Sequence, residues 1–453
     1  MFTLLVLAIL YIGYLFFNIK TLSLDVLLLS WHFFVLYVII AIFFLKKYRN
    51  VSIFSPELFF FIVFFLETFS YAPLLYNIET ANYSLNVLLP KVNDISIIKG
   101  QCIALLGFLF YILGAVIVKK NYSSVSNEKG YSIFIFSKNH IHFFTSMLII
   151  ISMIWGGYEL LNKYTDSTVG LTDASSFFPF LTIFIVISSV VEFLAISKKN
   201  IISFVYFFKK VNKLFCLNVF FLSVFFLLSG TRSFAFPLIL PVLFLYDRFI
   251  KKMKKKYVVL MLITSFFLML FIKDTRKNID ESVDISMDML SVGEDFISGN
   301  VALFYLVDYT DINGNQGGSN AILQMVSFIP FAQSFFVNVL GITNTPSSSE
   351  IFKNNTDTTW GLGTHVIGDL YYTFGWFGVI SCMFILGMLT SILYKKVNID
   401  SPKIGILVVY LLLLGNSLMF SRVEFFFLIR NIGFSLIILW LIKKNFSLRR
   451  RIL

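Results

Sequence analysis

Residues 360–396 read WGLGTHVIGDLYYTFGWFGVISCMFILGMLTSILYKK. The stretch begins with polar and glycine residues, continues as an apolar run and ends on Lys395 and Lys396. An apolar helix of about 20 residues is long enough to cross the hydrocarbon core of a bilayer. Lysines that close such a run are typical of the cytoplasmic end of a transmembrane helix. We therefore predict a membrane-spanning helix over 369–394.

The rest of the chain has the same character. Of its 453 residues, 58% are hydrophobic and 14% are charged, whereas soluble domains have about 45–50% and about 25%. The three cysteines lie in apolar runs, without disulfide or zinc spacing. We predict an all-α polytopic membrane protein of about twelve transmembrane helices. The predicted helices cover residues 2–18, 24–45, 56–75, 101–118, 143–161, 176–197, 214–229, 233–247, 257–273, 369–394, 403–420 and 425–442.

Basic clusters follow every second predicted helix. If these clusters lie in the cytoplasm, 26 of the 37 Lys and Arg residues are inside and 11 are outside. Because cytoplasmic loops are enriched in Lys and Arg, this asymmetry places both termini in the cytoplasm. It also explains the net charge of +12 by contacts with anionic lipid, so no nucleic-acid partner is expected. Residues 200–213 are too short to span and are expected to lie along the membrane surface.

The predicted topology divides the chain into three parts. Residues 1–273 contain the first nine helices, residues 274–366 form a large loop on the outer face, and residues 367–453 contain the last three helices and a basic tail. Apolar and aromatic residues in 296–307 and 321–340 predict that the loop folds. The second of these segments resembles a membrane-hugging or re-entrant helix broken at its proline.

Four arginines are predicted to lie on the outer face: Arg232, Arg276, Arg422 and Arg430. The planar arginine fork binds phosphate oxygens and stays charged when it is partly desolvated. These residues therefore predict a site for the phosphorylated head group of a lipid. The alternative is that they mark ordinary loop ends or pair with nearby acids.

His365 and Asp369 are four residues apart, so in a helix they share one face. The imidazole of His365 could act as a general base or hydrogen-bond donor, and Asp369 could orient it or accept a proton itself. Tyr371 and Glu350 are further candidates for substrate contacts. The outer segments have no Asp-x-Asp pair beside a second carboxylate cluster and no His/Cys spacing, so no metal or other cofactor is predicted.

Ser229–Ser233 (SGTRS), the long outer loop and residues 361–378 (GLGTHVIGDLYYTFGWFG) resemble the bacterial Wzy-type O-antigen and capsule repeat-unit polymerases. The resemblance covers nearly the whole chain as architecture, and these two stretches as motif. In the family pattern a glutamate is usual at the position of Asp369, and a small polar residue at that of His365.

The resemblance implies a GT-C-like fold in the bacterial inner membrane, with a periplasmic outer loop. It implies an inverting, metal-independent transfer of glycan from undecaprenyl pyrophosphate to a lipid-linked acceptor repeat unit. Arg232, Arg276 and Arg422 would neutralise the departing pyrophosphate, and Asp369 or His365 would deprotonate the acceptor. Membrane lipids, a chain-length regulator and a flippase are the other partners that it suggests.

Two alternatives are an O-antigen ligase and, in a different class, a flippase or transporter of the lipid-linked oligosaccharide. Residues 360–378 favour a polymerase over a ligase. A transporter is expected to carry charges within several helices, whereas the helix interiors here are almost free of charge. Glu67, Glu159 and Glu192 are the most notable exceptions.

Overall fold

The protein folds into two compact units, which are described separately. Unit 1 comprises Met1–Asn127, Met289–Lys395 and Ser417–Arg430, and unit 2 comprises Glu128–Asp288, Lys396–Asn416 and Asn431–Leu453. Throughout the described part of the chain the regular structure is helical, without strands. The structure, a computed structural model, describes residues 2–18, 25–48, 54–70, 92–120, 138–157, 178–197, 204–229, 232–254, 256, 264, 289–327, 329, 332–342, 345–356, 363–398 and 402–452.

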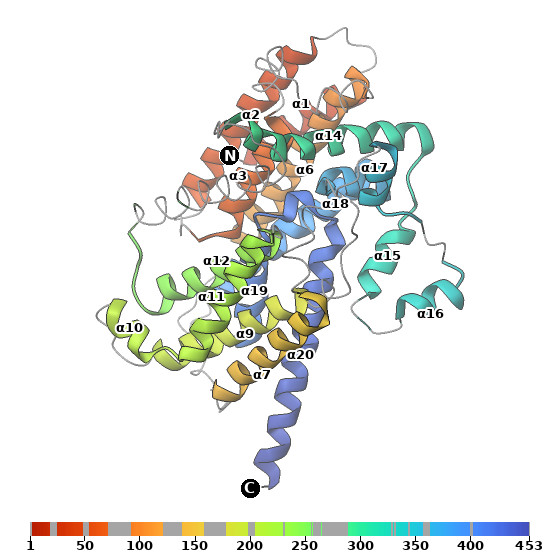
Figure 1. The fold of residues 1–453 in the computed structure, drawn as a ribbon. Coiled ribbons are helices and arrows are strands. Elements are labelled where there is room, and N and C mark those ends of the chain that lie inside the picture. The colour runs from red at the N-terminus through yellow and green to blue at the C-terminus, as the bar shows by residue number, and fades with distance from the viewer. Residues whose placement is uncertain are drawn as a thin grey trace, which may run out of the picture. The chain divides into compact units, whose positions relative to one another are not determined.

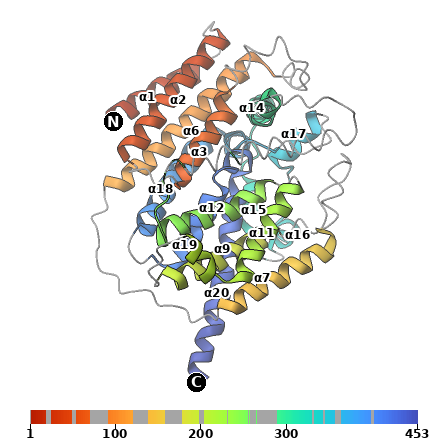
Figure 2. The same cartoon turned by 60° about the vertical axis from the view of Figure 1, so that its left-hand side comes forward.

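In unit 1 the central helix is α6, which contacts α1, α2, α3 and α14. Figures 1 and 2 show α1, α2, α3 and α6 side by side. Many α6 side chains are fully buried, as expected for a helix that is apolar on all sides and enclosed by others. The helices of unit 1 are α1 (Phe2–Asn18), α2 (Val26–Tyr48), α3 (Pro56–Phe69), α6 (Asp94–Lys120), α14 (Met289–Asn313), α15 (Ser319–Val326), α16 (Ala332–Asn338), α17 (Ser348–Thr356), α18 (Val366–Val397), the 3-10 turn Phe420–Arg422 and the start of α20 (Phe425–Ile452).

The close approach of α6 and α18 depends on Gly387. A Cβ atom added there would lie 1.9 Å from the carbonyl oxygen of Tyr111. One helical turn away, the Tyr111 hydroxyl is 2.9 Å from the Thr390 hydroxyl. Small residues let membrane helices approach backbone to backbone, where dispersion contacts replace the hydrophobic effect. Helix α6 therefore determines where α18 lies within unit 1.

Helix α18 contains a break at Gly375, whose φ of 69° and ψ of −164° are not helical. Such a break interrupts the i to i−4 hydrogen bonds across it. The carbonyl groups of Tyr372 and Thr373 instead accept hydrogen bonds from the backbone N–H groups of Gln316 (3.0 Å) and Gly318 (3.1 Å). The segment between α14 and α15 thus satisfies the broken turn, which apolar surroundings would otherwise make costly.

The predicted outer loop contains folded structure. Helix α14 packs on α3 and α6 and buries an apolar face from residue 301 to residue 307. The short helices α15 and α16, which Figure 1 shows next to each other, occupy the segment predicted as a broken helix over 321–340. Helix α17 packs on α14. The described residues of 296–307 and 321–340 are thus mostly helical, while the position of this segment on the outer face stays a prediction.

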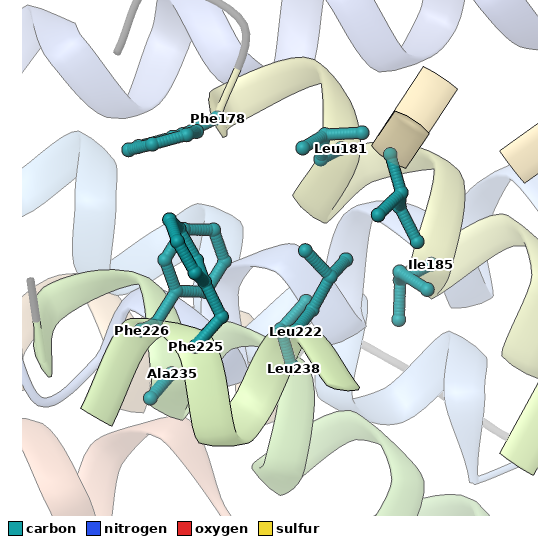
Figure 3. Packing of buried hydrophobic residues seen from close by; sticks show 9 residues of the cluster. Phe178, Leu181, Ile185, Leu222, Phe225, Phe226, Ala235 and Leu238 are labelled. Atoms are coloured by element: carbon teal, nitrogen blue, oxygen red, sulfur yellow. The ribbon is translucent and has the colours of Figure 1, made fainter. Parts of the chain in front are cut away.

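In unit 2, α9 contacts α7, α11, α12 and α19. Figure 3 shows an apolar cluster that joins α7, α9, α11 and α12, in which Phe178, Leu181 and Ile185 of α9 face residues of α11 and α12. A buried polar contact, His142 Nε2 to Glu192 Oε2 at 2.9 Å, links α7 to α9. The helices are α7 (Lys138–Ser152), the π-helical turn Met153–Gly157, α9 (Phe178–Ser197), α10 (Phe204–Lys210), α11 (Lys213–Leu228), α12 (Arg232–Phe249), α19 (Ile404–Asn416) and the remainder of α20.

Each predicted apolar segment other than 257–273 overlaps one of these helices. Segment 257–273 lies outside the described residues apart from position 264. Within the described residues, segments of α2, α6, α9 and α18 are long and apolar enough to cross a membrane, and five further apolar helices are shorter. The all-helical membrane class is thereby supported. The number of twelve spans, the GT-C-like arrangement and the placement of α10 at the membrane surface stay predictions.

Candidate functional site

The start of α17 joins two acidic residues that are far apart in the sequence. The hydroxyl of Ser348 donates to Asp369 Oδ1 over 2.7 Å. The hydroxyl of Ser349 donates to Glu424 Oε1 over 3.0 Å. Adjacent residues of one helix thus hold a carboxylate from α18 and another from the residue before α20. Short hydrogen bonds to a charged acceptor are among the stronger interactions in a protein, so this cluster fixes three helix starts relative to one another.

Asp369 is buried, with 1% of its surface exposed. Its second oxygen, Oδ2, accepts the backbone N–H of Phe425 over 3.0 Å. Phe425 is the first residue of α20, and the N–H groups of a first turn need partners from outside the helix. A carboxylate also suits the positive end of the helix dipole. Asp369 therefore serves as a cap for α20, and both of its oxygens accept a hydrogen bond.

Glu424 is less buried than Asp369. Its Oε2 accepts the side-chain amide of Gln324 over 2.7 Å, which brings α15 to the same place. Its charge also acts on the guanidinium of Arg430, which stacks over the ring of Phe427 at 4.7 Å. Glu424 thus sits among hydrogen-bond donors and beside an arginine. Nothing local in the sequence marks the contacts of Glu424 with α15 and α17.

Arg422 pairs with a buried acid of α3. Its Nε lies 3.4 Å from Glu67 Oε1, and the side chains are 27% and 0% exposed, respectively. A buried carboxylate is tolerated when a positive group compensates it, so the pair accounts for the acid found within an apolar helix. The backbone carbonyl of Arg422 accepts the N–H of Thr364 over 3.2 Å. Thr364, which lies just before α18, therefore fixes the backbone of Arg422.

His365 is fully buried directly before α18. Its Nδ1 accepts the backbone N–H of Ile367 over 3.2 Å. A neutral imidazole with an acceptor at Nδ1 carries its proton on Nε2, which then donates to the hydroxyl of Thr68 over 3.1 Å. Burial lowers the pKa of His365 to about 3. The ring is therefore neutral, caps the start of α18 and ties it to α3.

Two other predicted residues make separate contacts. The hydroxyl of Tyr371 donates to Asp311 Oδ1 over 2.7 Å, and the ammonium of Lys99 lies 5.4 Å from its ring. Glu350 accepts the N–H of Ser347 over 2.9 Å, while its own N–H donates to the Ser347 hydroxyl over 3.2 Å. This reciprocal arrangement is a capping box for α17.

For the remaining predicted arginines the structure gives no side-chain contacts. Arg232 is the first residue of α12 in unit 2, and Arg276 lies outside the described residues. Among the residues that the structure describes, no group of three or more His, Cys, Asp or Glu side chains could hold a metal ion. The chemistry that the cluster offers is that of arginine forks beside carboxylates, which suits a phosphorylated ligand and a proton transfer.

The long apolar helices are those of an integral membrane protein, and the acids and arginines at the starts of α17, α18 and α20 form its candidate reaction site. The chain belongs to the family described as O-antigen polysaccharide polymerase Wzy, whose model matches residues 1–449. Members of this family are polymerising, glycosyltransferase-like enzymes that act on lipid-linked repeat units in membranes. No curated protein and no solved structure matches the chain.

Proposed function

We propose that the protein transfers a growing glycan from undecaprenyl pyrophosphate to the non-reducing end of a lipid-linked repeat unit. The reaction takes place at the outer, periplasmic face of the bacterial inner membrane and inverts the anomeric centre without a metal. The observation that carries this proposal is the cluster of Arg422, Arg430, Glu424 and Asp369 at the starts of α18 and α20. Family membership supplies the general activity.

In the proposed step, an acceptor hydroxyl oxygen forms a bond to the anomeric carbon of the donor sugar. The bond from that carbon to the pyrophosphate oxygen breaks, and the lipid pyrophosphate leaves with the bonding electrons. Arg422 and Arg430 offset the negative charge on the leaving oxygen, since charge stabilisation is most effective where charge develops in the transition state. The pairing of Arg422 Nε with Glu67 orients the guanidinium, whose fork has five N–H donors in total.

Glu424 accepts the proton of the acceptor hydroxyl in this mechanism. It is less buried than Asp369, and donors from Gln324 and Ser349 hold its two oxygens in place. A carboxylate keeps further acceptor capacity beyond these two hydrogen bonds. Asp369 and His365, the catalytic candidates from the sequence, become positioning residues in this proposal because their contacts hold the starts of α20 and α18.

A charge-free segment next to the site suits the lipid part of the substrate. Residues 312–349 contain no Asp, Glu, Lys or Arg, although the outer segment as a whole is rich in acids. Within it, Phe335, Val339 and Leu340 are 52%, 65% and 56% exposed. Exposed apolar side chains without charges favour contact with hydrocarbon. We propose that this segment lies in the outer leaflet, where the polyprenyl tails reach the reaction site.

The proposal retains Arg232, Arg276, Tyr371 and Glu350 as contributors to substrate binding. A flippase that delivers the repeat unit and a chain-length regulator are its proposed protein partners.

The deciding experiment is reconstitution of the purified protein in liposomes with lipid-linked repeat units. EDTA is added to remove divalent metal ions, because the proposed transfer does not need one. The wild type is expected to produce a ladder of polymer lengths. Arg422→Ala, Arg232→Ala and Glu424→Gln are expected to leave single repeat units. Glu424→Asp, which retains a carboxylate, is expected to keep partial activity, and each variant is checked for its melting temperature in detergent.

Three outcomes would contradict the proposal. Glycan transfer only to lipid A-core, with no ladder from repeat units alone, would identify a ligase. Movement of the repeat unit across the bilayer without new glycosidic bonds would identify a flippase. Full ladders from both Arg422→Ala and Glu424→Gln would show that the cluster does not carry the chemistry.

A further inference from the structure

A row of aromatic rings runs along one face of α14 beside α17. Tyr305 and Tyr309 are four residues apart, so they share this face, and their ring centroids are 6.4 Å apart with planes inclined by 31°. Tyr305 packs against Phe352 of α17 at 5.7 Å. Tyr309 meets Tyr372 of α18 edge to face at 6.0 Å. Both α14 rings are half-buried, so their positions are fixed while part of each ring remains accessible.

The hydroxyl groups of these two tyrosines differ from those of the deeply buried tyrosines of unit 1. Those of Tyr37, Tyr111, Tyr371 and Tyr372 all have a hydrogen-bond partner. In the described part of the chain, the Tyr305 and Tyr309 hydroxyls have none within the protein. Fully buried tyrosine hydroxyls usually find a partner within the protein, whereas those of half-buried tyrosines can reach water or a ligand. The two α14 hydroxyls are thus directed to solvent or to a ligand.

Asp308 adds a polar group at the same place. It lies between the two tyrosines in the sequence and its Oδ1 accepts the hydroxyl of Ser96 over 2.6 Å. Partial burial, together with the nearby Tyr309 and Asp308, raises the pKa of Tyr305. The Tyr305 hydroxyl therefore keeps its proton and can donate a hydrogen bond.

The row leads toward the proposed reaction site. Tyr372, at its inner end, donates its hydroxyl to the carbonyl oxygen of Pro346 over 3.1 Å. Three residues later, Ser349 donates to Glu424 over 3.0 Å. The inner end of the row thus contacts the same short segment that holds Glu424.

We infer that Tyr305 and Tyr309 form a sugar-binding subsite for the acceptor repeat unit, a role that rests on the proposed transfer to that unit. A pyranose ring has a face of C–H groups, which packs on an aromatic ring, and a rim of hydroxyls, which needs polar partners. The ring-to-ring distance of 6.4 Å allows one sugar ring on each tyrosine. Asp308 and the two tyrosine hydroxyls provide the polar partners.

The first test is binding, measured independently of activity. The probe is the repeat-unit oligosaccharide released by mild acid from lipid-linked repeat units, and saturation-transfer NMR detects its contact with the full-length protein in detergent. The wild type is expected to transfer magnetisation to sugar C–H protons. Tyr305→Ala and Tyr309→Ala are expected to weaken binding about tenfold each, the usual effect of losing one aromatic contact. Tyr309→Phe, which keeps the ring, is expected to lose less.

The second test separates binding from chemistry in the reconstituted enzyme. Tyr305→Ala and Tyr309→Ala are expected to raise the KM for the acceptor unit about tenfold, with kcat within about threefold of the wild type. The matched control is Tyr14→Ala on α1, whose tyrosine is 61% exposed and is expected to leave both constants unchanged. Melting temperatures close to that of the wild type exclude misfolding.

The possible results are distinguishable. Wild-type polymer formation with unaltered binding and KM in both alanine variants would overturn the subsite and leave the proposed function intact. Oligosaccharide binding that depends on the two tyrosines, without polymer formation by the wild type, would support a glycan site and contradict the polymerase. An equal loss in Tyr14→Ala would show that the effect is not specific to this row, which would also overturn the subsite.

Discussion

Replacement of Gly387 by alanine tests the packing that positions α18. The new Cβ would lie 1.9 Å from the Tyr111 carbonyl oxygen, whereas real Cβ contacts are essentially never shorter than 3.0 Å. The two helices would have to separate by at least 1.1 Å, the difference between those distances. Because the obstacle is backbone, a side-chain rotation cannot relieve it. Overpacking of this kind costs about 1–3 kcal/mol, and the separation also weakens dispersion contacts along the interface.

The assay is thermal unfolding of the purified protein in detergent, followed by near-ultraviolet circular dichroism. A loss of about 2 kcal/mol is expected to lower Tm by about 4–8 °C. The matched control is Gly13→Ala in α1, where nothing lies within 4 Å of the added Cβ. Since alanine is the better helix former by about 0.5–1 kcal/mol, this variant is expected to melt at or slightly above the wild-type temperature. Equal Tm values for the two variants would refute the close contact between α6 and α18.

Three further predictions concern His365 and Gly375. His365→Asn retains a capping acceptor for the Ile367 N–H, so we expect polymer formation to continue in the reconstitution assay, and its loss would restore an acid–base role for the imidazole. Burial lowers the pKa of His365 from 6.5 to about 3. Between these two pH values His365 therefore binds a proton in the unfolded chain but not in the folded chain. Stability is therefore expected to fall as the pH drops from 6.5 toward 3, by up to about 1.4 kcal/mol per pH unit, and His365→Asn should reduce this slope in pH-dependent melts. Gly375→Ala is expected to lose at least about 1 kcal/mol, since its φ of +69° is unfavourable for a residue with a Cβ. Limited proteolysis should then cut more readily after α14, and an unchanged digestion pattern would contradict the anchoring of that segment to the broken turn.

The location of the predicted helices could be inferred from the sequence because their signal is local. A chain segment within hydrocarbon must satisfy its own backbone hydrogen bonds, so a long apolar run with few charges has to be helical. The segments predicted over 2–18 and 233–247 coincide closely with α1 and α12. The apolar character of 296–307 likewise predicted ordered structure in the outer segment, where α14 is found.

The site was only partly predictable. The sequence identified Asp369, Arg422 and His365 as unusual polar residues at the ends of apolar runs. It did not identify Ser348 and Ser349, since serines in a polar loop are common and nothing local indicates that they contact acids 21 and 75 residues away. A run of serines before a glutamate is the local sign of a helix start, and that was the available signal.

The helical membrane class and the family resemblance were therefore contained in the sequence by itself, because composition and short motifs determine them. The contacts of individual side chains were decided by the tertiary structure. Nothing local in the sequence relates His365 to Thr68, and only folding brings the two side chains into contact. Glu67 had been noted as a charge within an apolar segment, and only folding brings it to Arg422. Such pairings join residues hundreds of positions apart, so they depend on how the helices pack rather than on any local pattern.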